Sequence, residues 1–207
     1  MMTAFNRLTN RAIKQFAARR LARDLRYDPV DTALLLVGIQ TELLTEADAV
    51  AAIGRLLTAA RASGLRTYYS PVERATPEHG IAYPTPSQFE LLPLLTPTTG
   101  VHPRLIPAAD DVVLPPTPRL SAFAGTDLAD RFADLGVRRV VLAGARTDIE
   151  IDSTARDAVE LGLQTTVIAD CCTGTTHAAH TATLEITFPR IVHGVVAVDD
   201  LLRRLPE

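Results

Sequence analysis

Short apolar runs and amphipathic stretches alternate along most of the chain, from residue 31 to the end. The runs are nearly continuous, which is typical of strands that are buried on both faces of a sheet. They predict strands at 33–39, 66–70, 111–114, 138–143, 165–169 and 191–197. The stretches between them have the period of a helix, and they predict helices at 47–63, 86–95, 126–135, 151–162, 177–187 and 199–205.

This alternation predicts the α/β class, in which a parallel sheet carries helices on both faces. The proline-rich residues 71–118 form the least regular region, and we expect them to cap a pocket rather than to form a second domain. In open parallel sheets, ligands bind beyond the carboxyl ends of the strands, at the point where the strand order reverses. We therefore expect the pocket there.

The N-terminal segment differs from the rest in both pattern and charge. Apolar residues recur at helical spacing from Leu8 to Leu25, so residues 6–25 are expected to form an amphipathic helix. Residues 6–26 carry a net charge of +6, from seven basic residues and one acid, so the remainder of a chain of net charge −3 carries −9. We expect this helix to pack on the body or on a second subunit. A membrane surface, a nucleic acid or a role as a transit peptide are the alternatives.

Length and composition narrow the class of protein. With 207 residues and 47% hydrophobic residues, the chain is long enough for one domain, expected at 31–207 after an N-terminal segment at 1–30. No apolar run approaches the roughly 20 residues of a membrane span, and the first residues lack the apolar core of a signal peptide. We expect a soluble, cytoplasmic protein. No binding motif or interleaved aromatic residues favour nucleic acid.

The cysteine and histidine residues predict neither a disulfide nor a metal site. Cys171 and Cys172 are adjacent, so a bond between them is geometrically unfavourable, and we expect both to be structural. His177 and His180 are three residues apart at the start of an expected helix, but no third ligand is evident. We expect no metal and no cofactor.

Five segments carry a family resemblance by their order and spacing, and the most distinctive is GARTDIEIDSTARDAVELG at residues 144–162. The others lie at residues 33–44, 70–90, 121–128 and 167–188. Together they resemble the isochorismatase-like cysteine hydrolases over roughly residues 31–202. The resemblance implies a three-layer α/β/α fold with a six-stranded parallel sheet in the order 3-2-1-4-5-6. It also implies a dimer or tetramer, and a cis peptide bond that would here be Ala145–Arg146.

The resemblance further implies a catalytic aspartate, lysine and cysteine, and all three matching positions are substituted. They are Gly38, Thr117 (or Pro115, with a shift of two residues) and Glu150, and the only lysine of the chain is Lys14. The three groups act as a unit, and a unit that loses a member retains only residual catalysis. Family members that hydrolyse isochorismate without the cysteine still rely on the aspartate. Hydrolysis by the family mechanism is therefore not expected.

Glu150 is the candidate for any remaining catalysis, and two interpretations stand. A carboxylate near a helix start gains about 0.3–1 kcal/mol from the free amides, so it can serve as a capping acid. It can also act as a general acid or base, with Asp148 and Asp152 close in sequence. A full negative charge at this position predicts a preference for neutral donors or cations over small carboxylates, with the direction of Arg146 left open. The expected ligand contacts are Gln40, Tyr83, Phe123, Arg146 and Thr147.

Two functions follow as hypotheses. The first is an isochorismatase-like protein without hydrolase activity, which acts as a small-metabolite-binding or assembly subunit in a homo-oligomer or beside an active paralogue. The second is an enzyme of changed chemistry that uses Glu150 for proton transfer on a small metabolite. An open, polar pocket that converges on Glu150 favours the enzyme, whereas a pocket filled by side chains favours the binding or structural role.

Overall fold

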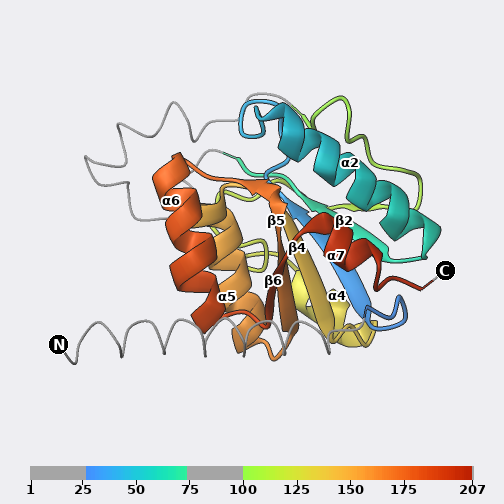
Figure 1. Cartoon of the computed structure of the whole chain (residues 1–207). Helices are drawn as coiled ribbons and strands as arrows, with labels where there is room; N and C mark the ends of the chain where they lie inside the picture. Colours follow the sequence, from blue (N-terminus) through green and yellow to red (C-terminus); the bar gives the residue numbers. More distant parts are fainter. Residues whose placement is uncertain (1–26, 74–99, 207) are drawn as a thin grey trace.

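The computed structural model describes residues 27–73 and 100–206 (Figure 1). The helices expected at 6–25 and 86–95, together with the expected ligand contact Tyr83, lie outside these residues. The remaining strands and helices that the sequence pattern predicts fall within them.

The described strands form one parallel sheet in the order β3-β2-β1-β4-β5-β6. This arrangement confirms the α/β class and the strand order that the family resemblance implies. The strands are β1 (Thr32–Val37), β2 (Arg66–Ser70), β3 (Val112–Val113), β4 (Arg139–Ala145), β5 (Gln164–Thr173) and β6 (Gly194–Val196).

Helices cover both faces of the sheet (Figure 1). On one face, α2 (Ala47–Ala62) and α7 (Val198–Leu202) pack in a core that includes Leu34 and Leu36 of β1. On the other face, α4 (Leu128–Asp134) and α5 (Asp152–Glu160) pack in a core that includes Leu35. Successive residues of a strand point to opposite faces, so the continuous apolar run of β1 supplies both cores.

Helix α2 shows how the sequence pattern produces these layers. Its buried residues recur three and four positions apart, which places them on one face of the helix. They are Ala49, Val50, Ala52, Ile53, Leu56, Leu57 and Ala60. The helix ends at Ala62 with Ser63 as its C-cap, and Gly64 follows with φ +75°, a left-handed conformation that glycine adopts readily after a helix.

The structure differs from the predicted boundaries where helices and strands meet the candidate site. The helix expected at 151–162 is preceded without a break by a π-helical turn, η3 (Thr147–Ile151). The strand expected at 165–169 continues to Thr173, and its last three residues are buried again after the more exposed Ala169 and Asp170. The helix expected at 177–187 divides into α6 (His177–Ala182) and a second π-helical turn, η4 (Thr183–Thr187), before η5 (Phe188–Arg190). Among the described residues, no helix is long and apolar enough to span a membrane.

Candidate functional site

Strands β1 and β4 are neighbours in the middle of the sheet, and the strand order reverses between them. Their carboxyl ends therefore flank the position where parallel sheets bind ligands. Gly38 follows β1 directly, and Arg146 follows β4 directly. The sequence placed the candidate site at these two strand ends, and the structure brings them together.

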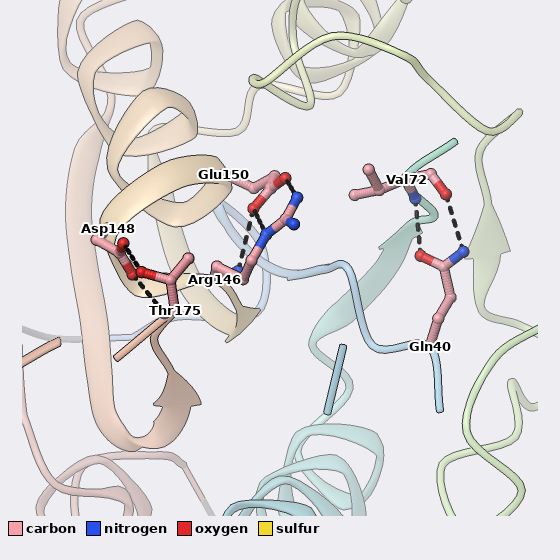
Figure 2. A network of polar contacts seen from close by, with 6 residues as sticks. All are labelled: Gln40, Val72, Arg146, Asp148, Glu150 and Thr175. Atoms are coloured by element: carbon pink, nitrogen blue, oxygen red, sulfur yellow. Dashed lines mark hydrogen bonds and ion pairs between the residues drawn. The ribbon is translucent and has the colours of Figure 1, made fainter. Parts of the chain in front are cut away.

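An ion pair between Arg146 and Glu150 occupies the end of β4 (Figure 2). Nε of Arg146 donates to Oε2 of Glu150 at 2.8 Å, and Nη2 donates to Oε1. The backbone N–H of Arg146 also donates to Oε2, at an N–O distance of 3.2 Å. The two side chains are 6% and 1% exposed. Both carboxylate oxygens of Glu150 are thus engaged by one residue, and the pair is closed to water.

This pair answers the question about Arg146 that the sequence left open. The guanidinium points at Glu150, so its positive charge compensates the negative charge of that carboxylate. The premise of an uncompensated negative charge was therefore wrong. Glu150 also accepts from the backbone N–H just before η3, as a capping acid does, although most of its contacts are with the guanidinium.

The acids near Glu150 do not converge on it. Asp148 accepts hydrogen bonds from the backbone N–H of Thr175, at 2.8 Å, and from the hydroxyl of the same residue (Figure 2). Asp152 accepts from Nε of Arg156, at 3.0 Å. Each of the three carboxylates therefore has a different partner, and Asp148 and Asp152 do not contact Glu150 through these hydrogen bonds.

Gly38 occupies a position where a side chain does not fit the backbone. Its φ is +61°, and a Cβ built on it would lie 2.6 Å from the carbonyl oxygen of Ala145. On the neighbouring strand, Gly144 has φ +129°, and its Cβ would lie 1.9 Å from the carbonyl oxygen of Val37. The ends of β1 and β4 thus approach each other as only glycine allows. The peptide bond Ala145–Arg146 is cis, as the family resemblance implied.

Gln40 joins the loops that follow β1 and β2 (Figure 2). Its Nε2 donates to the carbonyl oxygen of Val72, and its Oε1 accepts from the backbone N–H of Val72, both at 2.9 Å. The residue is buried. Its amide therefore holds the backbone of a neighbouring loop, and its expected contact with a ligand stays a prediction.

Thr117 lies beyond the end of β2, beside Val72. The two residues form a parallel β-bridge, and the hydroxyl oxygen of Thr117 accepts from the backbone N–H of Arg119 at 3.2 Å. Thr117 also borders a hollow of about 410 Å³, which has three prolines and two arginines in its lining. The lining residues are Pro115, Pro116, Thr117, Pro118, Arg119, Gly125, Thr126, Asp127 and Arg131.

The other expected contacts, Phe123 and Thr147, are both buried. The ring of Phe123 packs edge to face on Phe132, at a centroid distance of 5.7 Å. The hydroxyl of Thr147 lies 2.8 Å from Nδ1 of His180. Sequence reasoning missed Thr175 and His180 as partners of η3, because the pairs are 27 and 33 positions apart and only the position of α6 beside η3 brings them together.

Cys171 and Cys172 are free and buried in β5. Burial raises the pKa of both thiols, that of Cys172 to about 12, because the charged thiolate is poorly solvated in the core. Neither residue therefore offers a nucleophilic thiolate at neutral pH. The described residues contain no group of three or more histidine, cysteine, aspartate or glutamate side chains that could hold a metal ion.

Comparison with known proteins identifies the family. The model of the Isochorismatase domain family matches residues 11–197. The chain belongs to the isochorismatase family. One family relative is YecD of Escherichia coli O157:H7, described as an uncharacterized isochorismatase family protein. It is 28% identical over 186 residues, which cover 84% of this chain and 96% of YecD.

Solved structures of similar proteins have the same fold. A cysteine hydrolase from Pseudomonas syringae pv. phaseolicola 1448A matches with a TM-score of 0.72 at 22% identity, covering 87% of this chain and 95% of that one. An isochorismatase family protein from Burkholderia thailandensis also gives a TM-score of 0.72, at 24% identity, covering 88% and 99%. At these identities the likeness supports the fold, and the chemistry must be argued from the residues of this chain.

Proposed function

We propose that this isochorismatase-family protein has no hydrolase activity and acts as a small-metabolite-binding or assembly subunit. The observation that carries the proposal is that the carboxylate of Glu150 is buried and paired. Its two carboxylate oxygens are both held by Arg146, and its side chain is 1% exposed. A catalytic base must reach the proton that it abstracts, within hydrogen-bonding distance. Glu150 instead contacts Arg146, the residue that directly precedes the helical turn in which Glu150 lies.

The two other substituted positions support the same proposal. Gly38 carries no acid, and its backbone conformation would bring even a Cβ to 2.6 Å from the carbonyl oxygen of Ala145. The hydroxyl of Thr117 cannot supply the positive charge of a lysine, and it accepts from the backbone N–H of Arg119. The mechanism that the resemblance to the cysteine hydrolases implies uses an acid, a cation and a thiolate together.

Steady-state assays on amide, nicotinamide and isochorismate substrates test the loss of hydrolysis. We expect no turnover above background, with the Pseudomonas syringae cysteine hydrolase assayed beside it as a comparison. Glu150→Ala and Gly38→Ala variants should give the same background rate as the wild type. Robust turnover that Glu150→Ala abolishes would refute the proposal and would establish the carboxylate as a catalytic group.

The assembly part of the proposal concerns the N-terminal residues 6–26, whose apolar stripe from Leu8 to Leu25 and charge of +6 suit contact with a second, acidic body. We expect the full chain to be a dimer or tetramer through this segment. Light scattering on the full chain and on a chain that starts at Asp31 gives the molar mass of each particle. An unchanged number of subunits after the deletion would refute this role of the segment.

A further inference from the structure

Arg146 presents its donors as a carboxylate-binding site does. The guanidinium is planar, and two of its nitrogens can contact the two oxygens of one carboxylate side by side. Nε and Nη2 do so here, and the backbone N–H of the same residue adds a third donor at 3.2 Å. Three donors thus face one carboxylate in a region that is almost completely buried.

The carboxylate in this site belongs to the protein itself. Glu150 lies four residues after Arg146, at the last but one position of η3. The helical turn therefore places its side chain beside Arg146, at the end of β4. A glutamate differs from an alanine by the group CH2–COO⁻. That group has the size, shape and charge of acetate, which makes acetate a matched probe for the space that the glutamate fills.

When Glu150 is removed, the positive charge that attracts an anion stays in the site. An arginine in a protein cannot lose its proton, so the charge of Arg146 persists. Among the described residues, the two acids that flank Glu150 in sequence accept hydrogen bonds from other residues, Asp148 from Thr175 and Asp152 from Arg156. A buried cavity that is created by truncating a side chain can bind a small molecule of matching chemistry from solution.

We propose that Arg146 and its backbone amide form a carboxylate-binding site that Glu150 fills from within. The native protein consequently takes no small carboxylate at the end of β4, and its ligand brings a neutral group to this point. This inference rests on the proposed non-catalytic role of Glu150. It replaces repulsion by an unpaired acid, which the sequence suggested, with occupation of a site that would otherwise bind an anion.

Acetate binding to the Glu150→Ala variant tests the proposal. We expect a dissociation constant on the order of 1 mM, because a ligand of so few atoms has a limited total binding energy. At 50 mM acetate, the melting temperature of the variant should rise by about 5 °C. Acetamide, which has the same shape without the charge, should give no rise. The wild type should respond to neither compound.

The double variant Arg146→Met/Glu150→Ala is the matched control, because it removes the donors and the occupant together. Acetate should not stabilise it, and calorimetry should detect no binding. If the single variant is unfolded in plain buffer, the measurement becomes the recovery of native circular dichroism on addition of acetate. Recovery with acetate but not acetamide supports the site.

Two outcomes would overturn the inference. One is the absence of any acetate response in Glu150→Ala, and the other is an equal response in the wild type or in the double variant. Neither outcome depends on the hydrolase assays. Turnover by the wild type would refute the proposed function while leaving acetate binding by the variant as a separate result.

Discussion

The loops after β1 and after β4 are both held by polar contacts, but the contacts differ in charge and in the sequence separation of the residues that they join. At β1, the neutral amide of Gln40 joins the backbone of Val72, 32 positions away. At β4, the charged Arg146 and Glu150 join each other across four positions. The first contact joins the loops that follow two neighbouring strands, whereas the second joins two residues of one helical turn.

This difference determines what each contact contributes. Burying two charges costs desolvation energy that their attraction only approximately offsets, so the pair at β4 adds little net stability but is costly to break in half. In the neutral contact at β1, both the desolvation cost and the attraction are smaller. Its loss leaves backbone groups of Val72 without their partner. The two strand ends should therefore respond differently to single and double substitutions.

The largest expected effect is that of Arg146→Met, which leaves the carboxylate of Glu150 buried without its cation. We expect a loss of about 3–5 kcal/mol in the free energy of unfolding, measured by urea denaturation. The double variant Arg146→Met/Glu150→Leu should recover most of that loss. If the single and double variants are equally unstable, the description of the contact as a charge pair is wrong.

Gly38→Ala tests the close approach of β1 to β4. A residue with a Cβ at φ +61° is strained, and this Cβ meets the carbonyl oxygen of Ala145 at 2.6 Å. We expect a loss of about 2–3 kcal/mol in the free energy of unfolding. Gly38→Asp, which introduces the aspartate that the family resemblance implies at this position, should be no more stable and should show no hydrolysis. Gly54→Ala in α2, where nothing lies within 4 Å of the added Cβ, is the control and should not destabilise the protein.

Gln40→Leu should cost about 1–3 kcal/mol, because it leaves a buried N–H and a buried carbonyl of Val72 unpaired. The effect should be smaller than that of Arg146→Met, since no ionised group is left behind. Gln40→Glu keeps the acceptor for the N–H but loses the donor to the carbonyl oxygen. Urea denaturation of both variants beside the wild type measures the effect. If Gln40→Leu is as stable as the wild type, the Gln40 amide does not hold the backbone of Val72.

The smallest effect at neutral pH concerns Cys172, whose pKa burial raises from 9.0 to about 12. Below pH 9 the thiol is neutral in the folded and the unfolded chain, and its contribution to stability is fully present. As the pH rises from 9 toward 12, the unfolded chain ionises first, so stability is lost. Cys172→Ala should reduce the slope of stability against pH in this range. The buried tyrosines are retained in the variant, so they do not account for a change in slope.

Reactivity of the thiols gives a second measure of the same burial. A thiol reagent added to the native protein at pH 7 should modify neither Cys171 nor Cys172 before the protein unfolds, because the thiolate is the reactive form. Rapid modification of the folded protein would contradict the burial of both residues in β5.

Local pattern was enough to predict the layered fold. The apolar runs of β1 and β4 and the helical spacing of α2 depend on neighbours in the chain, so the sequence located these elements. The family resemblance added the strand order and the position of the cis peptide bond. The boundaries around η3 and β5 were missed, because a π-helical turn and the continuation of a strand past exposed residues depend on the segments that pack against them.

The sequence by itself placed Gly38 and Glu150 after adjacent strands, and the family resemblance implied that they stand where the family has its catalytic aspartate and cysteine. It could not decide where Arg146 points, since a flexible side chain can face water or a neighbour with little change in local pattern. It could not pair Gln40 with Val72 or Asp148 with Thr175, because these contacts join segments 32 and 27 positions apart. Only the packing of strand ends in the sheet brings such groups together, and at Gln40 and at the Arg146–Glu150 ion pair it also excludes water.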